Sequence, residues 1–176
     1  MAQLDNYRSV GMEIYERLHL ATYPVAIKYI RDVGEIPVDF IRPTALGQKA
    51  SLCQAFTYAR RFGFHVAMTE EDNFCTPATV MHRWVDVPAE VLIESQLLQG
   101  WHCDTEAERK RIEHGRSMIG EANLPKLRQY MGFVCSPLPD AQFEPDTVLI
   151  FGNGENITHI IHALTYEGEN FPTSSF

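Results

Sequence analysis

The chain has 176 residues, of which 45% are hydrophobic and 22% charged, and its formal net charge is −8. This composition is typical of one globular domain, and the lack of a broad basic face argues against a nucleic-acid binder. No stretch reaches the roughly 18 consecutive apolar residues that a membrane helix needs. The polar segment 1–8 lacks the apolar core of a signal peptide, so we expect a cytoplasmic protein.

The first quarter of the chain predicts a helix, a strand and a long loop. Apolar residues at helical spacing over 4–18 predict an amphipathic helix, which the pair Tyr23-Pro24 ends. Residues 24–30 have the pattern of a strand with proline at its first position, where a missing amide hydrogen is tolerated. Residues 31–48 predict a loop, and a loop of this length is often functional or covers a site.

The next segment predicts two helices that flank a short strand. Residues 51–54 have the pattern of a capping box, which predicts a helix to about residue 61 that stops at Gly63. Residues 64–69 predict the strand. The pair Thr76-Pro77 is typical of an N-cap followed by the first helical residue, and we expect this helix to continue to about residue 84.

The remaining elements complete a mixed α/β fold with a single central sheet and flanking helices. In chain order we expect two helices, two strands and a last helix over 88–98, 105–118, 132–138, 147–151 and 155–166. Glycines 152 and 154 lie where Rossmann-like folds bind phosphates, but Ile157 replaces the third glycine of that motif. A tight turn with Asn153 as N-cap is therefore the preferred interpretation.

Cysteines are the residues best suited to chemistry. The sequence has no Cys-X-X-Cys pair, which argues against zinc-finger and thioredoxin motifs. Cys53 is at the second position of a predicted helix and Cys75 just precedes a predicted N-cap, where the helix dipole favours a thiolate. Cys103 also precedes a predicted helix. Cys135 lies in an apolar strand pattern typical of the core, and burial as a small apolar side chain remains the alternative for Cys53 and Cys75.

Histidines offer a second set of candidate ligands. His159 and His162 share one face of the last predicted helix, opposite an apolar stripe. This placement predicts that they point to solvent or to a partner surface, together with Glu155 and Tyr166. The histidines at 65 and 82 lie near the Cys75 segment in sequence, but their spacing does not identify them as ligands.

Several segments, taken in order, resemble the DUF169 family, which is also described as ArCR-like. The matching segments are 23–28, 51–55, 69–77, 143–153 and 163–168. The resemblance implies a prokaryotic cytoplasmic protein, typical of archaea and anaerobic bacteria, without an established activity. It also implies that the recurrent cysteines of the family correspond to Cys53 and Cys75. Since family members usually continue past Phe176, we expect a single domain over 1–176 that is a fragment, a shortened member or an incompletely known sequence.

We expect Cys53 and Cys75 to bind an iron–sulfur cluster or another metal ion, with a redox or accessory role. Clusters usually need four ligands, so Cys103, the missing C-terminal segment or a partner subunit would supply the others. Two alternatives remain open: a cysteine-dependent small-molecule enzyme with Cys53 as nucleophile, and a non-catalytic subunit of a larger complex. In each case we expect a homo-oligomer or a complex subunit, because the apolar loops leave surfaces for a partner.

Overall fold

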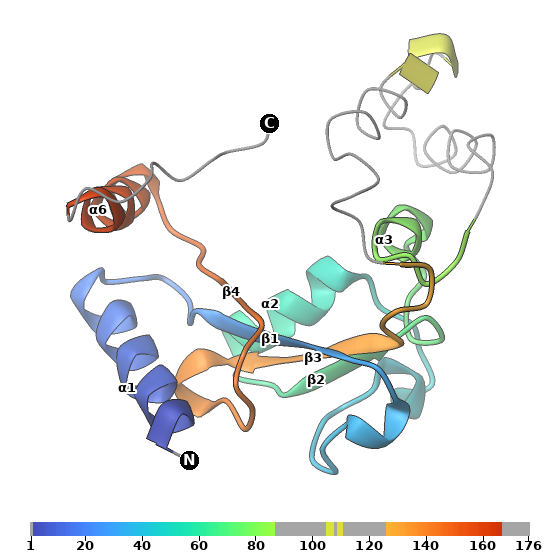
Figure 1. Cartoon of the computed structure of the whole chain (residues 1–176), viewed down its shortest axis with the longest axis horizontal. Helices are drawn as coiled ribbons and strands as arrows, with labels where there is room; N and C mark the ends of the chain where they lie inside the picture. The colour runs from blue at the N-terminus through green and yellow to red at the C-terminus, as the bar shows by residue number, and fades with distance from the viewer. Residues whose placement is uncertain (1, 87–104, 108, 111–125, 167–176) are drawn as a thin grey trace.

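A four-stranded antiparallel sheet, in the order β2-β3-β1-β4, organises the protein (Figure 1). The structure, a computed structural model, describes residues 2–86, 105–107, 109–110 and 126–166. The strands are β1 (Val25–Ile30), β2 (Val66–Thr69), β3 (Gly132–Pro137) and β4 (Thr147–Leu149). The predicted mixed α/β class with one central sheet and flanking helices is thus confirmed in the described part of the chain.

Helices precede or follow most of the strands. The α-helices are α1 (Ala2–Arg17), α2 (Leu52–Phe62), α3 (Thr76–Met81) and α6 (Gly154–Thr165), and the short 3₁₀ helices are η1 (Val33–Glu35), η2 (Pro43–Leu46) and η4 (Leu138–Asp140). The predicted helix over 88–98 lies outside the described residues. Of the predicted helix over 105–118, residues 105–107 and 109–110 are described, and they are helical.

Local signals fixed several helix ends as expected. The Ser51 side chain accepts from the Gln54 amide, and Gly63 ends α2 in a left-handed conformation with φ of 75°. Asn153 caps α6 in the same reciprocal way with Asn156. The helix predicted through residue 84 ends at Met81 instead, because Arg83 adopts a positive φ of 55° and turns the chain.

Strands β3 and β1 are the two inner strands of the sheet, and different elements cover its two faces. Side chains of β1, β2 and β3 alternate between the faces, as antiparallel strands require. Val25, Met68 and Phe133 pack on the face covered by α2 and α3, whereas Ala67 and Val134 pack on the face toward α1 and residues 36–40. Strands β1, β2 and β3 are therefore covered on both faces by helices or loops, whereas the edge strand β4 is partly exposed.

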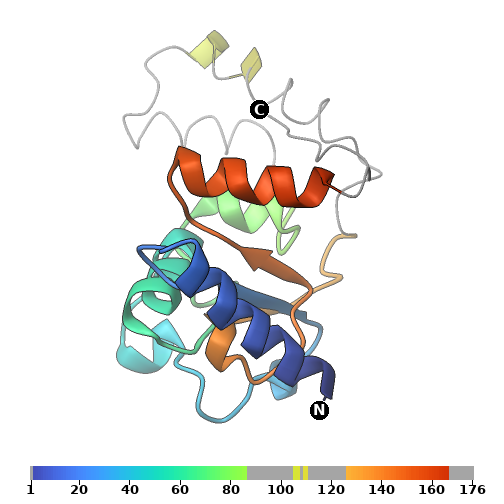
Figure 2. The same cartoon turned by 90° about the vertical axis from the view of Figure 1, so that its left-hand side faces the viewer.

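Helix α6 lies beyond the edge strand β4 and is held at its start (Figure 2). The Asn156 side-chain amide donates to the Leu18 carbonyl at the end of α1, with an N–O distance of 2.7 Å. No residue of α6 is buried. Among the described helices, none is both long enough and apolar enough to cross a bilayer.

Candidate functional site

The segments that carry Cys53 and Cys75 run side by side immediately before their helices. Ala50 and Asn73 form a parallel β-bridge. The Ala50 amide donates to the Asp72 carbonyl at 2.9 Å, and the Phe74 amide donates to the Ala50 carbonyl at 3.3 Å. Backbones paired in this way are about 5 Å apart. Helices α2 and α3 therefore both start from one bridge.

Cys53 is the second residue of α2, as the sequence predicts, and it is exposed with a free thiol. The preceding capping box is complete, because the Ser51 amide also donates to the Gln54 side chain at 2.8 Å. An exposed sulfur at this position is accessible to a ligand or to another chain.

Cys75 is itself the N-cap of α3, so the prediction that Thr76 caps this helix is wrong by one residue. Asn73 explains the shift. Its side-chain oxygen accepts from the Cys75 amide at 3.2 Å, and its side-chain nitrogen donates to the Cys75 carbonyl at 2.9 Å. This turn holds the Cys75 backbone extended, so that its carbonyl becomes the first acceptor of the helix. The Cys75 thiol is free, half-buried and makes no capping hydrogen bond.

Of the other two cysteines, the structure describes Cys135 but not Cys103. Cys103 lies outside the described residues. Cys135 is fully buried on β3, as expected of a core residue, and burial raises the pKa of its thiol well above the ordinary range. In the described ranges, no group of three or more His, Cys, Asp or Glu side chains could hold a metal ion. The described part therefore contributes two accessible thiols and no complete ligand set.

The histidines near the Cys75 segment in sequence have other partners. His65 pairs with Asp140 at 2.9 Å through Nε2 and contacts the Gln142 amide at 3.2 Å through Nδ1. His82 lies in a cluster of aromatic rings, stacked on Trp84 with ring centroids 5.4 Å apart and 5.8 Å from the ring of Tyr29. On α6, His159 is exposed, as predicted, and approaches Glu155 at 3.9 Å.

The environment of His82 makes stability depend on pH. Burial lowers the pKa of His82 below its ordinary value of 6.5. The unfolded chain then takes up a proton more readily than the folded one as the pH falls through 6.5, so stability is lost in that direction, by at most about 1.4 kcal/mol per pH unit. We expect His82→Phe, which keeps the ring stack, to reduce this loss in urea unfolding. His159→Gln, at an exposed ring, serves as control, and an equal pH dependence in both variants would contradict the assignment.

An ion pair between the fully buried Asp72 and the Arg42 side chain, which is 25% exposed, adjoins the Ala50–Asn73 β-bridge, and no sequence pattern indicated it. Asp72 is fully buried. Its carboxylate accepts from the Arg42 guanidinium at 2.9 and 3.0 Å, and from backbone and hydroxyl groups of Thr44 and Thr69. Burial alone would raise the pKa of Asp72, but these hydrogen bonds outweigh it and hold the pKa below its ordinary value.

This ion pair also anchors the segments that form the β-bridge ahead of Cys53 and Cys75. The carbonyl of Asp72 accepts from Ala50, while its side chain holds residues 42–44. The backbone that leads into α2 and the backbone that leads into α3 are thus tied to one buried residue.

The fold and the cysteine segments define a mixed α/β protein in which two cysteine-bearing helices start from one β-bridge. The chain belongs to the DUF169 family, described as uncharacterised ArCR, whose sequence model matches residues 13–176. This membership confirms the resemblance found in the short sequence segments. No curated protein and no solved structure is significantly similar to the chain.

Proposed function

We propose that the protein binds a metal ion or an iron–sulfur cluster through the thiolates of Cys53 and Cys75. The observation that carries the proposal is the Ala50–Asn73 bridge, from which both cysteine-bearing helices start. Thiolates are soft ligands that favour zinc, copper(I) and iron–sulfur clusters. A reducing cytoplasm, the location expected from the sequence, would keep both thiols free for such a ligand.

The donor set decides what kind of site this would be. Structural zinc sites and iron–sulfur clusters usually have four protein ligands, and the described residues offer two thiols here. Cys103, or the same cysteines of a second copy, would complete the set. The exposure of Cys53 suits either arrangement, because its sulfur can be reached from outside the domain. A redox or accessory role would follow from such a centre.

The cysteine-dependent enzyme is less well supported. A nucleophilic cysteine needs a base within hydrogen-bond reach. In the described part of the chain, no hydrogen bond joins a histidine to Cys53 or Cys75, and His65 is already engaged by Asp140 and Gln142. A bound metal would supply the positive charge that stabilises the thiolates without any such base.

Cobalt(II) added to the reduced protein without oxygen tests the metal site, because thiolate ligation produces an intense charge-transfer absorption. We expect this absorption in the wild type, and at least a tenfold loss of affinity in Cys53→Ser and in Cys75→Ser, since each removes a direct ligand. Loss of an outer-shell partner alone typically costs about 10–100-fold. Cys135→Ala, at a fully buried thiol, is the matched control and should bind as the wild type does. Equal binding by all three variants would contradict the proposal.

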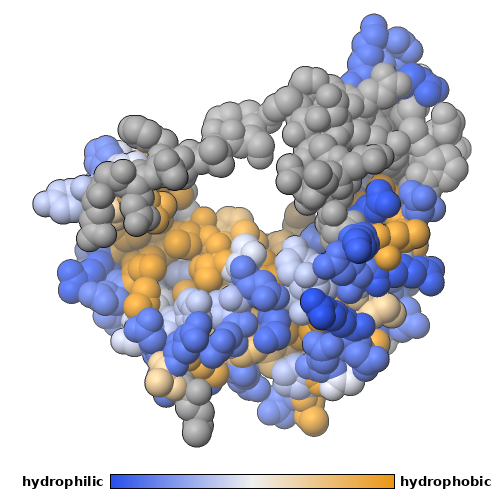
Figure 3. Space-filling model, viewed as in Figure 1, coloured by the Kyte–Doolittle hydropathy of each residue, from blue (hydrophilic) through white to orange (hydrophobic). Residues whose placement is uncertain are grey.

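A role as subunit of an assembly is favoured by helix α6. Ile157 and Ile161 on its apolar stripe are 37% and 38% exposed, and Leu164 is 56% exposed. Figure 3 shows hydrophobic surface gathered over β4 and next to α6. A contiguous apolar surface of this kind typically marks a contact with another chain.

The assembly role predicts self-association that depends on this stripe. In sedimentation at micromolar concentration we expect an oligomer, which Ile161→Glu should dissociate because it places a charge in the apolar contact. His162→Gln, on the exposed polar side of the same helix, should leave the oligomer intact. A stable wild-type monomer would count against self-association through α6.

A further inference from the structure

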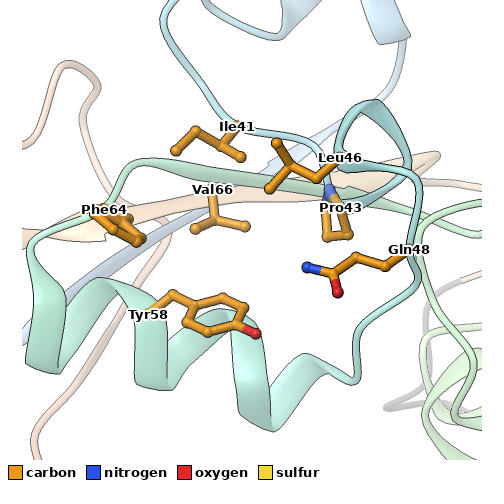
Figure 4. A pocket seen from close by; sticks show the side chains of 7 residues that line it. All are labelled: Ile41, Pro43, Leu46, Gln48, Tyr58, Phe64 and Val66. Carbon is orange, nitrogen blue, oxygen red and sulfur yellow. The ribbon is translucent and has the colours of Figure 1, made fainter.

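A small pocket lies between the loop that contains η2, strand β2 and helix α2 (Figure 4). Its volume is about 190 Å³. The lining side chains are Ile41, Pro43, Leu46, Gln48, Tyr58, Phe64 and Val66. In Figure 4 Ile41 and Leu46 lie above the pocket, Gln48 lies at its right-hand side and Tyr58 lies below it.

The lining is apolar except at one end. None of the lining side chains carries a charge. The two hydrogen-bonding groups are the Gln48 amide and the Tyr58 hydroxyl, and Figure 4 shows both at the same end, with Phe64 at the other. Within the described residues, neither group has a protein hydrogen-bond partner. An amide and a phenol can each donate and accept a hydrogen bond.

The walls of the pocket are held independently of any ligand. The Ile41 amide donates to the His65 carbonyl at 2.9 Å, and the Ala67 amide donates to the Ile41 carbonyl at 3.0 Å, which fixes the loop to β2. The buried pair of Arg42 with Asp72 holds the next turn of the same loop. Binding sites for small molecules are usually preformed in this way.

The size and the lining of the pocket restrict which ligands would fit. An enclosed apolar cavity of about 150 Å³ in another protein binds benzene, and this pocket has room for one ring although it is partly open to solvent. We propose that this pocket binds a small neutral aromatic compound with one ring and one hydroxyl group, of which phenol is the simplest. The ring would pack against Tyr58 and Phe64, and the hydroxyl would pair with Gln48 and Tyr58. A carboxylate or an ammonium group would find no opposite charge in the lining.

Phenol and benzene form a matched pair of probes, which differ in the hydroxyl group alone. Titration of the full chain, followed by chemical shifts of the Tyr58 ring, should give saturable binding of both, with phenol tighter. Gln48→Leu should weaken phenol about tenfold, the loss expected for one hydrogen bond, and leave benzene unchanged. Leu46→Trp should abolish binding of both, because Leu46 is 64% exposed at the pocket and a larger side chain would fill the space.

Val38→Trp is the control for the filling variant, since Val38 is 99% exposed and does not line the pocket. It should bind both probes as the wild type does. The proposal would be overturned by phenol binding that survives Leu46→Trp, or by an equal effect of Gln48→Leu on both probes. It would also be overturned if neither probe bound. If Leu46→Trp then dissociated an oligomer, the pocket would hold a side chain of a second copy of the chain.

Discussion

Gly132→Ala should lower the free energy of unfolding by about 3 kcal/mol, the upper end of the typical cost of overpacking, because a clash with rigid backbone cannot be relieved by a side-chain rotation. Gly132 begins β3 and pairs with Ile30 on one side and Thr69 on the other. A β-carbon at this position would collide with the backbone carbonyl oxygen of Met68 and lie 3.1 Å from the Thr69 α-carbon. Relief would therefore require β3 to separate from the edge strand β2.

Urea unfolding of Gly132→Ala and Gly154→Ala measures this effect. Gly154 is the matched control, because it is the first residue of α6 and a β-carbon there would meet no atom within 4 Å. We expect the control to change stability by less than about 0.5 kcal/mol. Similar unfolding midpoints for the two variants would show that the strands at Gly132 are not packed as described.

Asp72→Asn should cost about 1–3 kcal/mol, the loss expected when buried hydrogen-bonding groups lose their partner, because Arg42 is 25% exposed and still contacts Glu71. The amide would keep the shape of the carboxylate but would present hydrogen atoms to donors at Arg42, Thr44 and Thr69. The neighbouring Glu71 provides a matched control, because it also contacts Arg42, at 3.3 Å, but is 81% exposed. Glu71→Gln should cost less than about 1 kcal/mol.

The pH dependence of the free energy of unfolding tests the same ion pair in a second way. The pKa of Asp72 is held below its ordinary value of 3.8, so its contribution is present above that pH and is lost as the pH falls through the lower folded-state value. The stability difference between wild type and Asp72→Asn should therefore shrink in acid. A difference that stays constant down to the most acidic pH tested would contradict a charged, hydrogen-bonded Asp72.

The elements that the sequence predicted well are those set by neighbouring residues. The capping box at Ser51, the left-handed end at Gly63 and the cap at Asn153 all depend on contacts within four residues. The strand predicted over 147–151 ends at Leu149, because pairing with β1 stops there. Strand pairing is a long-range interaction, and an apolar pattern does not report its limits.

Most of the candidate site depends on contacts that no local pattern contains. The Ala50–Asn73 bridge and the pair of Arg42 with Asp72 join segments that are more than twenty residues apart in the sequence. Arg42 and Asp72 look like surface residues in the sequence, since charged side chains are rarely buried without a partner. The sequence identified both cysteines, but the β-bridge that brings the starts of α2 and α3 together follows from these long-range contacts.

The content of iron, zinc and sulfide in the chain purified without oxygen tests the central proposal most directly. We expect a stoichiometric metal in the wild type and in Cys135→Ala, and its loss together with any visible colour in Cys53→Ser and in Cys75→Ser. Cys103→Ser, measured alongside, reports whether that cysteine completes the ligand set or a second copy does. A folded wild-type protein with no bound metal, or a metal content that both serine variants retain, would contradict the account.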